Sequence, residues 1–136
     1  MGFANSIVAG ILRSPAHRLL SGSTALVAYD GRRTGRHIVL PTQYALAGDD
    51  LVVLVGRPET KHWWRNFTEP GDVDVLVAGE WRPMTGEAIR GAEDPEGAAP
   101  LLATYLDRFP RAAKVLGSGT DEERRARVVL VRCRPR

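Results

Sequence analysis

Apolar and polar residues alternate with the period of β-strands through most of the chain. The first such segment, residues 24–29, reads TALVAY and leads into an Asp-Gly turn signal. The next, residues 37–44, contains Pro41, which cannot donate to a sheet ladder and therefore predicts an edge strand or a bulge. Residues 51–55 read LVVLV, a continuous apolar run that predicts burial on both faces.

Three further strands complete the predicted sheet. Residues 73–78 and 81–89 are separated by a two-residue Gly-Glu turn, and residues 127–134 form the last strand. Tight turns between consecutive strands favour an antiparallel sheet that curls into a small barrel. A doubly wound parallel sheet is disfavoured, because helices do not alternate with strands.

Short helices flank these strands. Residues 1–21 are expected to be helical, with an amphipathic first helix and a restart at Ser14-Pro15. Thr60 is placed to cap a short helix over residues 61–67. A longer amphipathic helix is predicted over residues 95–116, ended or kinked at Pro110.

A capping box and a single cysteine complete the pattern near the C-terminus. Thr120 and Glu123 have the spacing of a capping box and predict a short helical turn. Cys133 is the only cysteine, so no intramolecular disulfide can form, and its place in an alternating strand favours a packing role.

Length and composition are those of one globular domain. The chain has 136 residues, of which 43% are apolar and 26% charged, and the prediction is a single α+β, mainly β, domain over residues 1–136. No apolar run reaches the roughly 20 residues that span a bilayer, and no basic region precedes the apolar N-terminus as in a secretory signal. The expected location is the cytoplasm, with peripheral membrane contact of the first helix left open.

Basic residues gather in two regions, although the net charge is only +3. Residues 31–65 hold six basic residues and three acids, and residues 124–136 hold six arginines and no acid. Such regions favour an anionic partner, either nucleic acid or a small molecule. Only two of the 19 basic residues are lysines, which indicates a GC-rich, actinobacterial-like composition. The arginines of residues 124–136 are therefore weaker evidence for an anionic partner.

The sequence lacks the common enzyme motifs. It has no Walker loop, no G-x-G-x-x-G, no H-E-x-x-H and no C-x-x-C. His17, His37 and His62 lack the clustered spacing of metal ligands, so no metal site is expected. Nucleic acid is disfavoured as a partner, because few aromatic residues are interleaved with the arginines to stack on bases.

The segment of residues 31–44, GRRTGRHIVLPTQY, is the most distinctive stretch. Glycines allow a tight turn that can aim N–H groups at an anion, and guanidinium groups suit phosphate or carboxylate. A hairpin turn with solvated arginines is the alternative. The residues of the turn are Arg32, Arg33, Thr34, Gly35 and Arg36.

A second distinctive segment, KHWWRN, covers residues 61–66. On a helix, adjacent tryptophans point about 100 degrees apart, so one can enter the core while the other caps a cleft. The alternative is that both clamp the helix to the barrel.

The two segments together resemble the deazaflavin-dependent nitroreductase family. The pattern G-R-[RK]-[ST]-G-[RK]-x4-P-x2-Y stands at residues 31–44, a strand ending at Gly56 follows, and W-W-R-N occupies residues 63–66. Residues 105–113, YLDRFPRAA, are similar to the C-terminal helix of the family. The resemblance implies an antiparallel split β-barrel like that of FMN-binding and pyridoxamine-phosphate-oxidase-like proteins, and coenzyme F420, with FMN as the alternative.

The resemblance also implies roles for individual residues. The arginine turn would hold the phosphate and acidic tail of F420, and Trp63 or Trp64 would wall the ring. Tyr44 is the first choice and Tyr105 the second for a proton donor. The remaining cofactor-binding candidates are Leu40, Pro41, Thr42, Tyr44, Gly56, Arg57, Lys61 and Asn66.

The activity that follows from the resemblance is hydride transfer from reduced F420 to a small electrophilic acceptor, such as a quinone, a nitro compound or an activated double bond. Basic residues that the family often carries before the proline are replaced here by HIVL, so the acceptor stays open. The alternative function is non-catalytic binding of a flavin-like, heme or lipidic ligand on the same barrel. A homodimer is expected by analogy with other split barrels.

Overall fold

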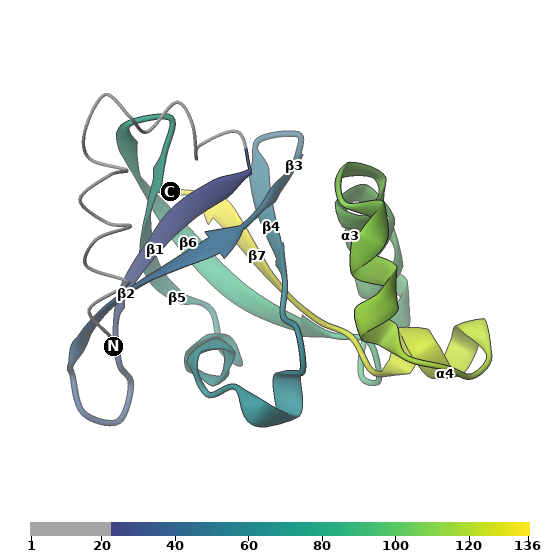
Figure 1. Ribbon diagram of the computed structural model, residues 1–136. Helices are drawn as coiled ribbons and strands as arrows, with labels where there is room; N and C mark the ends of the chain where they lie inside the picture. The colour runs from purple at the N-terminus through teal and green to yellow at the C-terminus, as the bar shows by residue number, and fades with distance from the viewer. Residues whose placement is uncertain (1–22) are drawn as a thin grey trace.

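The computed structural model describes residues 23–136 of the protein (Figure 1). The helices predicted within residues 1–21, and the membrane contact considered for the first of them, lie outside the described residues.

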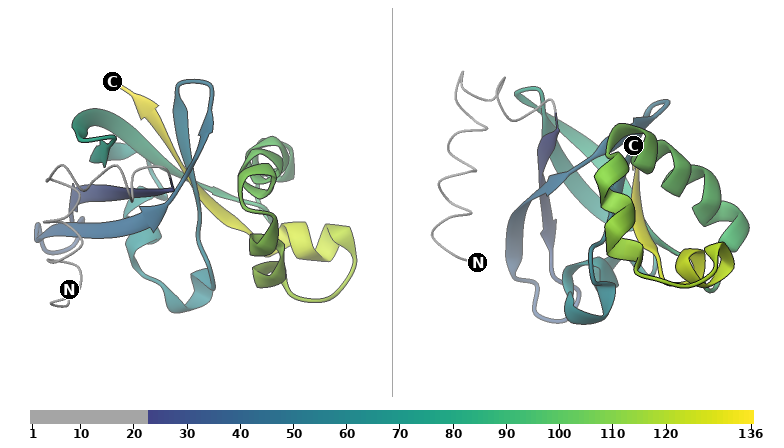
Figure 2. Two further views of the ribbon diagram at one scale, coloured as in Figure 1. Left: turned by 45° about the horizontal axis from the view of Figure 1, so that its top comes forward. Right: turned by 45° about the vertical axis from the view of Figure 1, so that its right-hand side comes forward.

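The described chain is built on one seven-stranded sheet in which every neighbouring pair is antiparallel. The sheet curls into a half-barrel, as Figure 1 and Figure 2 show, so the predicted antiparallel curled sheet is confirmed. Its spatial order is β2-β1-β5-β6-β7-β4-β3. The strands are β1 Thr24–Asp30, β2 His37–Gln43, β3 Ala45–Ala47, β4 Asp50–Leu54, β5 Gly71–Val77, β6 Glu80–Arg90 and β7 Val129–Pro135.

Strand positions follow the side-chain pattern closely. Pro41 lies on β2, an edge strand, opposite Leu26 of β1, as its missing N–H requires. Leu51, Val52 and Val53 on β4 are all at most 2% exposed, which confirms the prediction of burial on both faces. The strand predicted over residues 37–44 ends one residue earlier, and the short strand β3 that follows Tyr44 was not predicted.

The predicted helix over residues 61–67 is wrong in form. Two short 3-10 helices, η1 Pro58–Thr60 and η2 Trp63–Phe67, stand in its place. Thr60 does not cap the second one, because its Oγ1 donates to the carbonyl of Arg57 at 2.8 Å. Lys61 has extended backbone angles and separates the two turns.

The helix predicted over residues 95–116 is divided. Helix α3 spans Pro95–Arg108, and Asp94 caps it by accepting from the N–H of Gly97 at 2.9 Å. Phe109 leaves the helical conformation, and Pro110 starts the 3-10 helix η3, Pro110–Leu116. Helix α4 follows as Asp121–Ala126.

The capping box predicted for α4 is confirmed. The N–H of Glu123 donates to Thr120 Oγ1 at 3.1 Å, and the N–H of Thr120 donates to Glu123 Oε1 at 3.3 Å. Helices α3 and α4 lie together beside one end of the sheet, where α3 contacts β3, β4 and β7 (Figures 1 and 2).

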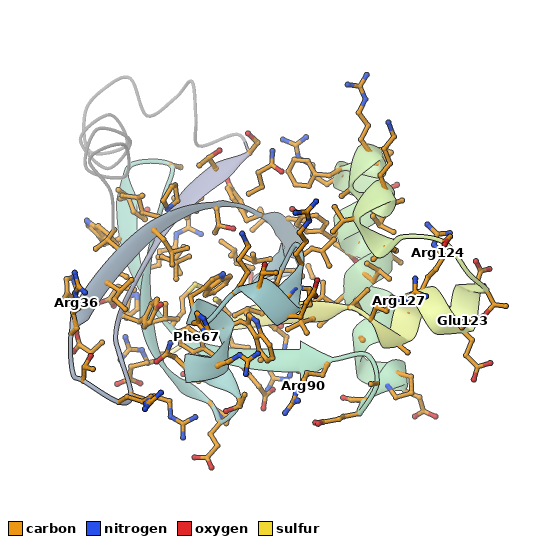
Figure 3. The ribbon with its side chains drawn as sticks, turned by 60° about the horizontal axis from the view of Figure 1, so that its bottom comes forward. Arg36, Phe67, Arg90, Glu123, Arg124 and Arg127 are labelled. Atoms are coloured by element: carbon orange, nitrogen blue, oxygen red, sulfur yellow. The ribbon has the colours of Figure 1, made fainter. Side chains whose placement is uncertain are left out.

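Two apolar cores support this arrangement. The first fills the half-barrel around Phe67, whose ring meets that of Tyr29 edge-on at 5.2 Å between centroids (Figure 3). A Cβ on Gly86 would come within 2.9 Å of the Phe67 ring, so β6 passes the ring closely where it has no side chain. The second core lies between α3 and the sheet around Leu102 and Leu130.

Cys133 belongs to the first core, as its strand position predicted. It is 1% exposed, and burial, with a smaller effect of the charge on Asp50, raises the pKa of its thiol to about 12. The thiol therefore stays protonated at neutral pH and packs as an apolar group.

Candidate functional site

A cleft about 340 Å³ in volume opens between strand β2 and the end of β4, and we call it the β2–β4 cleft. Six of its eight lining residues are cofactor-binding candidates from the sequence, drawn from β2, the β4 end and the segment that follows. Lys61 is the only charged residue among those that line it. The lining residues are Leu40, Pro41, Thr42, Leu54, Val55, Gly56, Lys61 and Trp63.

The two adjacent tryptophans face different surroundings. Trp63 is half-buried and lines the β2–β4 cleft, with its ring 6.4 Å from that of Phe67. Trp64 is 6% exposed, belongs to the core, and donates from Nε1 to the carbonyl of Pro58 at 2.9 Å. One tryptophan therefore enters the core while the other reaches a cleft, and Trp63 is the one available to wall a bound ring.

A second, larger cleft lies beside the first, between the end of β4 and the corner where α3 meets η3. We call it the α3–η3 cleft; its volume is about 680 Å³. The two clefts share Leu54 and Gly56, so the end of β4 is a common wall. The lining residues are Gln43, Leu54, Gly56, Tyr105, Arg108, Phe109, Pro110, Arg111, Ala112 and Val115.

The basic turn between β1 and β2 is closed by its own hydrogen bonds. The N–H of Gly31 donates to the carbonyl of Arg36, and the N–H of Gly35 donates to the carbonyl of Gly31, both at 2.8 Å. Gly35 has φ +70°, a conformation that favours glycine. The N–H of Arg36 donates to Thr34 Oγ1 at 3.2 Å. The N–H groups of Gly31, Gly35 and Arg36 are therefore used within the turn, and the anion site stays a prediction.

Arg32 ties the basic turn to the segment after η2. Its N–H donates to Asn66 Oδ1 at 2.9 Å, and its guanidinium donates to Thr68 Oγ1 at 3.0 Å and lies 3.6 Å from Glu69. Asn66 in turn donates from Nδ2 to the carbonyl of Trp63 at 2.9 Å. Arg32 and Asn66 thus position the turn and Trp63 relative to each other, and neither lines the β2–β4 cleft.

Arg33 and Arg36 differ from Arg32 in what their guanidinium groups contact. Both side chains are exposed, and within residues 23–136 neither guanidinium has a protein partner. Figure 3 shows Arg36 at the outer end of the β1–β2 hairpin, away from Phe67 in the half-barrel. Leu40 lies four positions beyond Arg36, about 13 Å along an extended chain at 3.3 Å per residue. The turn therefore lies at a distance from the cleft, along the same strand.

The two tyrosines considered as proton donors lie in different places. Tyr44 is 8% exposed and sits in the core, outside the lining of both clefts. Burial raises the pKa of its phenol, and the charges of Arg108 and Arg82 offset part of that rise. Tyr105 lines the α3–η3 cleft, and burial raises its pKa as well. Of the two, only Tyr105 reaches a cleft.

One predicted cofactor-binding residue, Arg57, lies outside both clefts, and three residues that line the α3–η3 cleft were not predicted. Arg57 is exposed, has φ 50°, and follows Gly56 without lining either cleft. Gln43, Arg108 and Arg111 line the α3–η3 cleft but were not proposed as site residues. Arg108 and Arg111 flank a Phe-Pro pair at the end of a predicted helix, a signal that the sequence contains.

Among residues 23–136, no group of three or more His, Cys, Asp or Glu side chains is placed to hold a metal ion. No helix in the same range is long and apolar enough to cross a bilayer.

Comparison with known proteins identifies the fold. No family model and no curated protein matches the sequence. Among solved structures, an F420-H2 dependent reductase aligns with a TM-score of 0.65 at 16% identity, covering 82% of this chain and 93% of that one. The heme storage protein HutZ from Vibrio cholerae aligns with a TM-score of 0.54 at 18% identity, covering 90% and 89%.

A pyridoxamine 5′-phosphate oxidase candidate from Listeria innocua also aligns, with a TM-score of 0.52 at 11% identity, covering 97% of this chain and 93% of that one. These proteins share the antiparallel split β-barrel, and the chain has that fold. The predicted fold class is therefore confirmed.

Proposed function

We propose that the protein is an oxidoreductase that transfers hydride from reduced coenzyme F420 to a small electrophilic acceptor. The observation that carries the proposal is the β2–β4 cleft, which brings together residues 40–42, Gly56, Lys61 and Trp63 from three separate segments. The fold shared with an F420-H2 dependent reductase supports it.

The residues of the cleft suit such a cofactor. The cleft volume of about 340 Å³ lies at the lower end of the roughly 300–1,000 Å³ typical of ligand sites. Trp63 offers an aromatic wall, strand residues 40–42 a mostly apolar floor, and Lys61 a cation. Arg33 and Arg36, which have no protein partner in the described chain, would bind the phosphate and acidic tail along β2.

When bound, F420 supplies the two-electron hydride chemistry, and the protein contributes orientation and shelter from water. Gly56, which forms the common wall together with Leu54, adds no side chain there, so a ring in one cleft would lie next to an acceptor in the other. A tyrosine phenol is protonated at neutral pH, and burial raises the pKa of Tyr105 further, so Tyr105 would have a proton to donate to the acceptor.

Fluorescence titration tests the proposal. Reduced F420 added to the full chain should quench tryptophan emission saturably, and Trp63→Phe should remove most of the quenching. Trp81→Phe is the matched control, because Trp81 is exposed and lines neither cleft. Absence of saturable quenching at micromolar F420, or equal loss in both variants, would overturn the proposal.

A turnover assay separates this proposal from the alternative, ligand binding without catalysis. The structural likeness to a heme storage protein supports that alternative. A catalytic protein should oxidise F420H2 only when an acceptor is present, and Tyr105→Phe should slow that step more than Tyr44→Phe. Binding of F420, FMN or heme without acceptor-dependent turnover would favour the alternative. The homodimer stays a prediction, to be checked by sedimentation velocity.

A further inference from the structure

We propose that the α3–η3 cleft binds small aromatic carboxylates and that such anions are the acceptors which the protein reduces. The second half of this statement rests on the proposed function, and the first half does not. The residues that line the cleft offer two guanidinium groups, a pair of aromatic rings and a side-chain amide.

The charge of the cleft is one-sided. Arg108, the last residue of α3, and Arg111, in the first turn of η3, both line it, and no carboxylate of the described chain does. Within residues 23–136, Arg111 makes no ion pair and no side-chain hydrogen bond. A planar guanidinium in this position can bind a carboxylate with two parallel hydrogen bonds.

The aromatic wall is preformed. The rings of Tyr105 and Phe109 lie with their centroids 5.0 Å apart and their planes 42° apart. The guanidinium carbon of Arg108 lies 5.0 Å from the centroid of the Phe109 ring, which holds this cation beside the wall. A flat, conjugated ligand can therefore stack on the wall while its anionic group meets an arginine.

The position of the α3–η3 cleft suits a binding site for the acceptor rather than for a second cofactor. It shares Leu54 and Gly56 with the β2–β4 cleft, so its ligand would lie directly beside a bound deazaflavin ring. Gln43 immediately follows strand residues 40–42, which line the other cleft, and adds an amide donor and acceptor. The lining of the α3–η3 cleft thus combines two cations, Arg108 and Arg111, with the wall at Leu54 and Gly56 that it shares with the β2–β4 cleft.

4-Nitrobenzoate and 4-nitrobenzamide form a matched pair of probes, equal in shape and different in charge. In the proposed step, the nitro group would take up the hydride from reduced F420 and a proton from Tyr105, one N–O bond would break, and the oxygen would leave as water. The proton that reduced F420 loses on oxidation would restore the Tyr105 phenol. The product is the nitroso compound, and F420 is left oxidised by two electrons.

The first arm measures binding by calorimetry to the full chain without F420. The carboxylate should bind about tenfold or more tightly than the amide, the gain typical of a charge-assisted hydrogen bond. Arg111→Gln should abolish this preference and Arg111→Lys should restore part of it. Arg134→Gln is the control, because Arg134 is exposed on β7 and lines neither cleft.

The second arm measures KM and kcat for both probes with reduced F420. Arg111→Gln should raise KM for the carboxylate about tenfold and leave KM for the amide unchanged. Equal affinity of wild-type protein for the two probes, or a preference that survives in Arg111→Gln, would overturn the proposed binding site. Carboxylate-selective binding without F420 binding would uphold the site and overturn only the F420-dependent function.

Discussion

The chain has two arginine-rich regions that look alike in sequence and differ in what their arginines contact. Residues 31–36, the basic turn, hold three arginines, and residues 124–136, the basic tail, hold six. In the tail, four of the six form side-chain bonds that join elements of the fold. In the turn, two of the three, Arg33 and Arg36, have no side-chain partner among residues 23–136.

The bonds of the tail begin at helix α4. Arg127 donates to the carbonyls of Leu116 and Ser118, the first at 3.0 Å, and Arg124 donates to the carbonyl of Ala113 at 3.2 Å. These carbonyls lie at the end of η3 and just beyond it, where a short helix leaves acceptors without intrahelical partners. Figure 3 shows both arginines at the α4 end of the molecule.

The bonds continue along β7. Arg132 meets Glu87 on the neighbouring strand β6 at 2.9 Å, and Arg136 meets Asp72 and Asp74 of β5 at 3.4 and 3.2 Å. These cations are matched within the fold. Many arginines in one segment therefore indicate a binding site for an external anion only where the fold supplies no acceptors for them. By this criterion, the basic turn remains a candidate anion site, and most of the basic tail does not.

The largest expected effect is on stability at the tail. Arg127→Ala leaves the carbonyls of Leu116 and Ser118 without this donor and should lower the free energy of unfolding by about 2 kcal/mol. In thermal denaturation, this corresponds to a fall in Tm of roughly 3–5 °C for each kcal/mol. F420 affinity, measured by the same fluorescence titration, should not change.

Arg125→Ala is the matched control for this variant. Arg125 lies on the same short helix and is exposed, without an ion pair among the described residues, so its loss should change stability by less than about 0.5 kcal/mol. Equal destabilisation by the two variants would contradict the structural role assigned to the tail.

The next effect is on binding at the turn. Arg33→Ala removes a guanidinium that has no partner in the described part of the chain and should weaken F420 binding about tenfold, near the lower end of the range for a bond to a charged group. Its Tm should match that of the wild type. The loss should shrink at high salt, because exposed charges are screened.

Arg134→Ala serves as the control for Arg33→Ala, since it removes the same charge from a site outside both clefts. A similar loss of affinity in both variants would mean that overall positive charge, and not the turn, attracts the cofactor.

The sequence predicted most of the sheet because its signals are local. Pro41 marks an edge strand through its missing N–H, and the apolar run at residues 51–55 marks a strand buried on both faces. Helical spacing left open whether Trp63 and Trp64 divide between core and cleft or both pack on the barrel. The structure has Trp64 in the core and Trp63 at the cleft, although the segment is a 3-10 turn. The two strand features need no knowledge of distant contacts.

The features that were wrong or missed depend on contacts between distant segments. The α3–η3 cleft forms because Phe109 leaves the helical conformation and turns Arg111 toward the end of β4, about 55 residues earlier in the chain. The burial of Tyr44 in the core also depends on the curl of the sheet and could not be predicted from the sequence, while its role as proton donor stays a prediction. Which arginines have partners likewise depends on carbonyls and carboxylates far away in sequence.

The smallest expected effect comes from Arg32. It lies in the basic turn but is paired within the fold, as most arginines of the basic tail are. Its guanidinium meets Thr68 and Glu69, yet it remains half-exposed, so Arg32→Ala should cost less than about 1 kcal/mol of stability. Its N–H bond to Asn66 is a backbone bond that survives the substitution and keeps the turn in place. F420 affinity should therefore fall less than threefold, clearly less than in Arg33→Ala. A tenfold loss in Arg32→Ala would show that the ligand competes with Thr68 and Glu69 for this guanidinium, and the division between paired and unpaired arginines would then fail at the turn itself.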